Sequence, residues 1–325
     1  MIWIRSARRS AAISVGIQQP GETGPGRRHE LVRLGCLLFI LTLAWIVAGA
    51  ATERASLASI ELPNQDVSFA TKDGLLTATF SETTDDAALN AAIPALVAKG
   101  VQAVSLRGAP IRNIRLFANL AGLRTLDICG TQVRDVSGLA SLTSLRSLNL
   151  QFLPISDLKP LAQLTNLQIL NIGGTDVHDL TPLAGLTSLR ELVIAVTKVA
   201  DVSPLAPLIQ LTSLDLGNTW VSNVRPLSGM ANLRDLKLNG TLVADVQPLS
   251  GMVSLRTLDI AATGVSDIRP LARLSELRAL NIEGTLVADV KPLATLTAMR
   301  SLALGGSLVS DISALAHLSE LAIRR

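Results

Sequence analysis

The stretch "TNLQILNIGGTDVHDLTPLAGL" at residues 165–186 decides the fold, because close relatives of it recur every 22 residues. Steps of 22 lead to "TSLRELVIAVTKVADVSPLAPL" at 187–208, "VSLRTLDIAATGVSDIRPLARL" at 253–274 and "SELRALNIEGTLVADVKPLATL" at 275–296. Nine units run from 121 to 318 without an insertion, a more degenerate unit precedes them at 99–120, and a fragment follows at 319–325. The chain beyond residue 99 is therefore an array of one short structural unit.

Each unit, numbered so that residue 165 is position 1, carries aliphatic residues at positions 3, 6, 8, 13, 16, 19 and 22. Positions 6 and 8 alternate with variable residues, as Leu170 and Ile172 do, and this indicates a strand. Positions 16, 19 and 22, such as Val246, Leu249 and Met252, are three apart, which suits a 3₁₀ turn. One unit buries too little apolar surface to order itself, so the units must stack and pair their strands about 4.8 Å apart.

The pattern LxxLxxLxIxxTxVxDVxPLaxL is similar to the leucine-rich repeat of bacterial internalins over about residues 99–323. The resemblance implies an α/β solenoid: an arc with a parallel sheet on its concave face and 3₁₀ or short turns on its convex face. The family's usual Asn at position 11 is replaced here by a hydroxyl. A hydroxyl can donate to one carbonyl and accept from one amide, so a polar ladder remains available. These residues are Thr131, Thr175, Thr197, Thr219, Thr241, Thr263, Thr285 and Ser307.

A small ββα cap is expected over residues 53–98, ahead of the repeat domain at 99–325. "DVSFATKDGLLTATF" at 66–80 predicts a hairpin that turns near residues 72–74. A helix is expected from Thr83 to Lys99, with Thr83 and Asp86 as a capping box and with Leu89, Ile93, Leu96 and Val97 on one face. Pro94 should kink or shorten it.

Residues 34–52 form an uncharged apolar segment that follows Arg27, Arg28 and Arg33. Two interpretations are open: a signal peptide cleaved after Ala50, and an uncleaved transmembrane anchor. Residues 1–33 would be a cytoplasmic or disordered leader. Both interpretations export the residues after 53, to the periplasm or cell surface or to the outer side of the inner membrane.

The sequence pI of about 9.2 reflects the leader, because residues 1–50 hold six arginines and two glutamates while the remaining charges nearly balance. The main domain therefore offers no case for nucleic-acid binding. No Ser/His/Asp or Cys/His arrangement, no GxxxxGK[ST] loop and no metal-type Cys/His cluster is visible. We expect that the protein is not an enzyme and that it holds neither a cofactor nor a metal ion.

A column of aspartates at position 15 has two interpretations: caps for the following turn, which we favour, and a cation-binding ladder. Its members are Asp135, Asp157, Asp179, Asp201, Asp245, Asp267, Asp289 and Asp311.

Arginines at position 4 are either an edge paired with Asp127, Glu191, Asp235 and Asp259 or a candidate anion-binding stripe. They are Arg124, Arg146, Arg190, Arg234, Arg256, Arg278 and Arg300. Trp220 and Phe152 lie in the loops after strands, and we favour packing on the edge of the solenoid over a role as ligand anchors.

Positions 5, 7 and 9 of the strands should form the concave face, and their variability against a fixed frame suits a binding surface. The candidate ligand-binding residues are Ile169, Glu191, Val193, Asp215, Asp235, Lys237 and Asp259. The expected function is non-catalytic binding of a protein, or of a glycan, in the bacterial cell envelope. The alternative is a structural envelope protein, anchored by residues 34–52, that self-associates through a C-terminal end capped only by Arg324 and Arg325.

Overall fold

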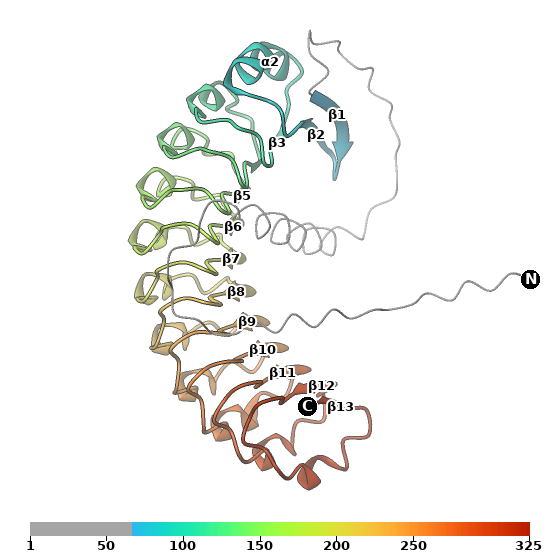
Figure 1. Ribbon diagram of the computed structural model, residues 1–325. Coiled ribbons are helices and arrows are strands. Elements are labelled where there is room, and N and C mark those ends of the chain that lie inside the picture. The colour runs from blue at the N-terminus through green and yellow to red at the C-terminus, as the bar shows by residue number, and fades with distance from the viewer. Residues whose placement is uncertain (1–66) are drawn as a thin grey trace, which may run out of the picture. The chain divides into compact units, whose positions relative to one another are not determined.

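The computed structural model describes residues 67–325, which form one sheet of thirteen strands in chain order (Figure 1). Strands β1 and β2 are antiparallel, and each later pair of neighbours is parallel. The strands are β1 Val67–Lys72, β2 Leu75–Phe80, β3 Ala103–Ser105, β4 Thr125–Asp127, β5 Ser147–Asn149, β6 Ile169–Asn171, β7 Glu191–Val193, β8 Ser213–Asp215, β9 Asp235–Lys237, β10 Thr257–Asp259, β11 Ala279–Asn281, β12 Ser301–Ala303 and β13 Ala322–Arg324. The expected solenoid is confirmed for these residues.

Each repeat forms one coil whose strand covers unit positions 5–7. The central residue points inward, so that Leu170 of β6 pairs in register with Leu148 and with Leu192 and is fully buried. Identical spacing in every unit puts leucine on leucine from coil to coil. The result is one continuous aliphatic core, in which a coil is stabilised mainly by its two neighbours.

The chain returns through a short 3₁₀ turn at unit positions 17–19, on the side away from the sheet (Figure 1). Proline at position 18, as in Pro248, suits the start of such a turn because the N–H that it lacks has no partner there. The 3₁₀ segments are Arg115–Asn119, Ser137–Leu139, Lys159–Leu161, Thr181–Leu183, Ser203–Leu205, Arg225–Leu227, Gln247–Leu249, Arg269–Arg273, Lys291–Leu293 and Ser313–Leu315.

The N-terminal hairpin turns at Asp73 and Gly74, as expected, and β2 adds to the repeat sheet through β3. The helix α2 spans Asp86–Ala98, and its N-cap is Asp85, whose carboxylate accepts the amide of Ala88 at 2.9 Å. The predicted capping box at Thr83 is therefore wrong, because the helix begins two residues later than that box requires.

Pro94 lies inside α2 without ending it, so the expected shortening does not occur. Leu89, Ile93 and Leu96 are buried, but Val97 is 46% exposed and leaves the predicted stripe. The carboxylate of Asp86 accepts the backbone amides of residues 112 and 113, which ties the start of the helix to the degenerate first repeat.

Unit position 10 adopts positive φ in all nine regular coils, at the turn that follows the strand. Glycine fills five of these places, while Phe152, Val196, Asn218 and Ala262 fill the others with φ of 60°, 60°, 56° and 52°. A Cβ atom at Gly174 would collide with the ring of Phe152, so this ring packs on the next coil, as the sequence predicts. Large and small residues at position 10 thus depend on one another across coils.

The last coil is one residue shorter than the others. Strand β13 pairs Ala322 with Ser301 and Ile323 with Leu302, an offset of 21 residues in place of 22. Ile323 therefore takes the inward central place, and of the two terminal arginines only Arg324 lies in the strand.

The leader and the two interpretations of residues 34–52 lie outside the described residues. Within 67–325, none of the helices combines the length and apolar character that a bilayer crossing requires.

Candidate functional site

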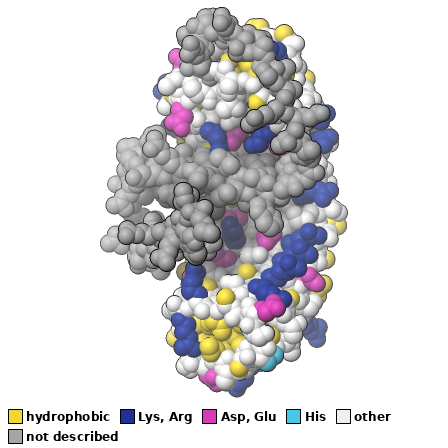
Figure 2. Space-filling model, turned by 90° about the vertical axis from the view of Figure 1, so that its right-hand side faces the viewer, with side chains coloured by type: hydrophobic (Ala, Val, Ile, Leu, Met, Phe, Trp, Pro, Cys, Tyr) yellow, Lys and Arg dark blue, Asp and Glu magenta, His cyan; other side chains and the backbone are white. Residues whose placement is uncertain are grey.

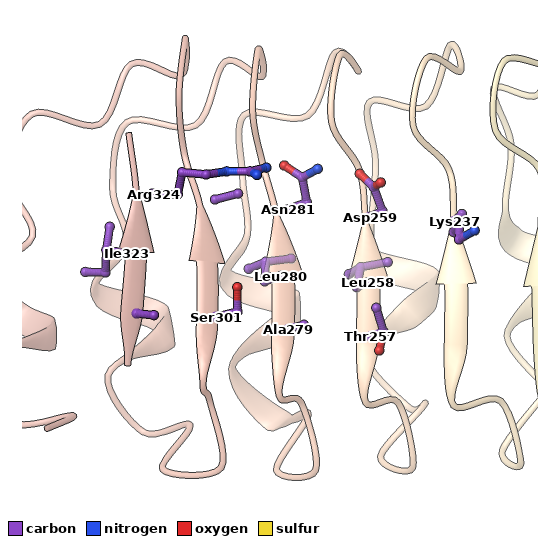
Figure 3. Close-up of a pocket in the computed structure, with 12 residues that line it drawn as sticks. Lys237, Thr257, Leu258, Asp259, Ala279, Leu280, Asn281, Ser301, Ile323 and Arg324 are labelled. Carbon is purple, nitrogen blue, oxygen red and sulfur yellow. The ribbon is translucent and has the colours of Figure 1, made fainter. Parts of the chain in front are cut away.

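A hollow of about 430 Å³ opens on the outward face of strands β9 to β13 (Figure 3). Its lining comes from five adjacent coils, which no single unit of the sequence reveals. The lining residues are Lys237, Thr257, Leu258, Asp259, Ala279, Leu280, Asn281, Ser301, Ala303, Ala322, Ile323 and Arg324.

Small side chains make this hollow. Ala279, Ser301 and Ala322 occupy successive strands at paired positions, and Ala303 stands beside Asn281. Short side chains leave the sheet surface uncovered, and Figure 2, which views the sheet side, shows hydrophobic groups exposed together in the lower part of the molecule. The floor of the hollow is therefore apolar and shallow.

Charged groups border the floor at both ends (Figure 3). Lys237 donates to Asp215 at 3.1 Å, and Arg324 reaches across one coil to pair with Glu283 at 3.1 Å. Burial raises the pKa of Asp259, while the amide of Ala261 and the charge of Lys237 partly oppose that rise. The rim thus presents both signs of charge beside an apolar floor.

Most polar side chains at unit position 7 are committed to the backbone. One oxygen of each accepts the amide two residues on, at 2.9–3.1 Å, and so closes the turn at the end of the strand. They are Asp127, Asn149, Asn171, Asp215, Asp259 and Asn281. Variation at position 7 is therefore partly constrained by structure.

Of the predicted ligand-binding residues, only Lys237 and Asp259 line the hollow. Ile169 and Val193 are half-buried on β6 and β7, outside it. Glu191 and Asp235 lie two strands apart, and the pKa of Glu191 is raised first by burial and then by the charge of Asp235. The structure thus gathers a site nearer the C-terminal end than the sequence predicts.

Sequence reasoning missed Ala279, Asn281, Ser301, Ala303 and Arg324 as lining residues. A signal was present, because positions 5 and 7 of the last two full units hold only Ala, Asn and Ser. Small residues do not resemble binding hot spots, and their effect appears only when several coils lie side by side.

The position-4 arginines form a row, since the amide of each of Arg256, Arg278 and Arg300 donates to the carbonyl of the arginine one coil before, at 2.7–2.8 Å. Six of the seven side chains are exposed, with Arg256 half-buried. Within residues 67–325, Arg256 pairs with Glu276 at 3.9 Å and Arg300 with Glu320 at 2.9 Å, and the other five have no ion pair.

The expected pairing of this row with Asp127, Glu191, Asp235 and Asp259 is therefore wrong. Asp127 pairs instead with Arg107 at 2.7 Å. The reason is direction: these carboxylates stand on the strand face, whereas the arginines leave the chain before the strand begins, beside position 2 of the next coil.

The aspartates at position 15 cap the 3₁₀ turns, each accepting the amide two residues on at 2.8–2.9 Å. Asn223, and Asn113 in the degenerate first coil, do the same where Asp is missing. In the part of the chain that the structure describes, no group of three His, Cys, Asp or Glu side chains could hold a metal ion. The capping interpretation holds.

The threonines at position 11 are buried and Ser307 is half-buried, and each hydroxyl donates to the carbonyl three residues earlier in its own coil, as Thr197 does to Ile194 at 2.8 Å. These bonds stabilise single turns and do not link one coil to the next.

A family model described as leucine-rich repeats in two copies matches residues 121–163. Curated proteins provide no match. Among solved structures, an internalin C2 of Listeria monocytogenes is 30% identical, over 72% of this chain and 91% of that one, with a TM-score of 0.54. The internalin InlF of the same species is 25% identical, over 77% and 85%, with a TM-score of 0.57.

The structure of TLR13 in complex with ssRNA13 is 20% identical, over 69% of this chain and 39% of that one, with a TM-score of 0.56, and shows likeness of fold alone. The internalin matches extend over most of both chains. The chain therefore belongs to the bacterial leucine-rich-repeat family of the internalin type.

Proposed function

We propose that this protein is a non-catalytic binding module that recognises a protein ligand through the concave face of its solenoid, with the hollow over β9–β13 at the centre of the contact. The observation that carries the proposal is the row of small side chains between charged ends, held on a rigid sheet. Family membership supports a binding role.

The chemistry of the hollow favours protein over the other ligand classes. An apolar side chain of a partner can fill the floor, while polar groups of the same partner meet Asp259 and Asn281. The lining contains no aromatic ring on which a sugar could stack. Basic and acidic residues nearly balance over 67–325, which disfavours a nucleic-acid ligand.

Site-specific photocrosslinking tests this assignment. A benzophenone amino acid placed at Ser301, in the hollow, should capture a ligand from envelope extract, and the same amino acid at Ser203, exposed on a 3₁₀ turn, should not. Ala303→Glu fills the floor and adds a charge, so it should lower the yield from Ser301 at least tenfold. Equal capture from both positions would exclude the concave face as the binding surface.

The same proposal places the repeat domain outside the cytoplasm, because the apolar segment 34–52 follows a basic leader. Cell fractionation of the full chain should find it exported, and deletion of 34–52 should leave it in the cytoplasm. The first residue of the exported protein then distinguishes the two interpretations: a cleaved signal peptide leaves a chain that begins near residue 51, and an anchor leaves residues 34–52 in place. If the full-length chain were found in the cytoplasm, the proposed location in the cell envelope would be wrong.

Self-association through the C-terminal coil is a second candidate function. Leu318, Leu321 and Ile323 are half-buried there, whereas their counterparts in inner coils are almost fully buried. Ile323→Lys should abolish concentration-dependent assembly if this end is the contact, as measured by sedimentation of the full chain. Assembly that survives Ile323→Lys would exclude the end as the contact.

A further inference from the structure

Exposed large apolar side chains gather on one edge of the solenoid, at the turns that follow the strands. Of the eight such residues in the described part of the chain, five lie on this edge: Val196, Trp220, Leu242, Leu286 and Leu308. The last four occupy unit position 12 and are 57%, 65%, 54% and 60% exposed. We call these four the strand-exit ridge. The expectation that Trp220 packs on the edge is wrong, because most of its side chain meets solvent.

The backbone holds the ridge in a fixed row. The amides of Trp220, Leu242, Leu286 and Leu308 each donate to the carbonyl of the valine at position 13 one coil before, at 2.9 Å. Gly264 makes the same bond at 3.0 Å in the coil between Leu242 and Leu286. Successive side chains are therefore spaced by one strand separation, about 4.8 Å.

The ridge begins where charge on this edge ends. In earlier coils, positions 12 and 14 carry Arg134, Asp176, His178 and Lys198, and Lys198 pairs with Asp176 at 3.3 Å. From Trp220 onward, position 14 holds only exposed serine or alanine: Ser222, Ala244, Ser266, Ala288 and Ser310. One molecule thus contains a charged and an uncharged version of the same edge. An edge that lacks charged residues and exposes large apolar side chains has the composition of a protein contact surface.

The order of residues identifies the occupant. Along position 12 the ridge reads large, large, glycine, large, large, and this order is the same from either end. Such an order suits a contact between two copies across a two-fold axis, because residue i of one copy meets residue j of the other and the reverse, so each large residue meets a large residue. With the axis at Gly264, Leu242 meets Leu286 of the second copy, and Trp220 meets its Leu308.

Geometry and charge agree with that arrangement. Both copies have the same coil spacing, so side chains that interdigitate at one coil remain in register at the others. The facing rows carry no charge, so their contact brings no like charges together. A bilayer fits less well, because basic residues, which attract anionic lipid, are missing from these rows.

The exposed area sets the strength of the contact. The ridge offers on the order of 400 Å² of apolar side chain per copy. Stable interfaces bury about 800 Å² per partner, so the ridge alone supplies about half of that area, as a weak association would. We infer that two copies of this chain associate, antiparallel, through the strand-exit ridge as a weak dimer. This dimer leaves the concave hollow on a different face, so it is independent of the proposed ligand site.

Sedimentation of the full chain, with all variants in the same non-ionic detergent, measures the association. The wild-type mass should rise toward twice the monomer mass with concentration, and Leu242→Glu with Leu286→Glu should weaken association at least tenfold. The matched control, Gln132→Glu with Lys198→Glu, changes position 12 outside the ridge and should associate like wild type. Circular dichroism of each variant verifies that the solenoid is intact.

Cysteine cross-linking tests the orientation. Gly264→Cys should give a disulfide-linked dimer with itself, since a Cβ atom there meets only ordinary contacts, the nearest being Ala244 Cβ at 3.4 Å. Trp220→Cys and Leu308→Cys should cross-link when the two variants are mixed, and neither should cross-link alone. A monomer at every concentration overturns the inference, as does association abolished only by Ile323→Lys or cross-linking of Leu308→Cys with itself.

Discussion

At the residue scale, the turn at unit position 10 places some residues in the left-handed region of φ, which their side chains disfavour. Val196 holds φ of 60° although its branched Cβ disfavours that region, and its side chain is 55% exposed. Valine at this position therefore strains the backbone of the coil.

Val196→Gly should therefore raise the free energy of unfolding by about 1 kcal/mol. Release of strain contributes about 1–2 kcal/mol, and the greater freedom of glycine in the unfolded chain removes part of that gain. Urea unfolding with an unchanged m-value measures the difference.

Gly284→Val is the matched reverse control. Gly284 has φ of 64° and space for a Cβ atom, whose nearest neighbour, in Ala262, would be 3.7 Å away. It should lose a similar amount of stability. Destabilisation by both substitutions would show that the backbone at Val196 is not strained.

At the element scale, the 3₁₀ turns are joined to their strands by the aspartate caps. Backbone and side-chain hydrogen bonds at the starts of the turns lower the pKa of Asp135, Asp179, Asp201, Asp267 and Asp311 below the ordinary aspartate value. Because the pKa of these groups is lower in the folded state, the ionised caps stabilise the fold fully at pH values above the ordinary aspartate pKa. That stabilisation is lost as pH falls through the lower folded values.

Replacement of these five aspartates by asparagine should leave stability at neutral pH nearly unchanged, because Asn223 caps its own turn in the same way at 3.0 Å. Below about pH 4 the wild type should lose stability faster than the variant, since only the wild type has these groups to protonate. Thermal unfolding between pH 2.5 and 7 measures both curves. Parallel curves would contradict a role for cap ionisation.

At the scale of the whole molecule, each coil depends on the coils beside it. Leu236 is fully buried between Leu214 and Leu258, whereas Ile323 has one neighbouring strand and is half-buried. Stability in such a stack is close to a sum of coil and interface terms.

Leu236→Ala should therefore cost about 2–5 kcal/mol, as a cavity between two coils does, and Ile323→Ala clearly less. Denaturant unfolding provides the values, and hydrogen exchange should show local opening confined to the last coils in Ile323→Ala. A larger loss at Ile323 than at Leu236 would contradict the dependence of each coil on the coils at both of its sides.

Much of this molecule follows from local sequence. The strand, the 3₁₀ turn and the caps recur at fixed spacing because each depends on residues within one unit, as Asp201 does on the amide of Ser203. The aliphatic core positions and the hairpin at residues 67–80 were predictable for the same reason. Errors began where a short pattern competed with another, as Thr83 did with Asp85 at the start of α2.

The sequence by itself determined the repeat, its strand and turn, and the stacking that one unsupported unit makes necessary. Only the tertiary structure decided that Arg300 pairs with Glu320, that β13 is offset by one residue, and that small side chains of five coils leave a hollow over β9–β13. The physical reason is range. Hydrogen bonds inside a unit repeat with the unit, whereas contacts between coils depend on the volumes and directions of side chains about 22 residues apart.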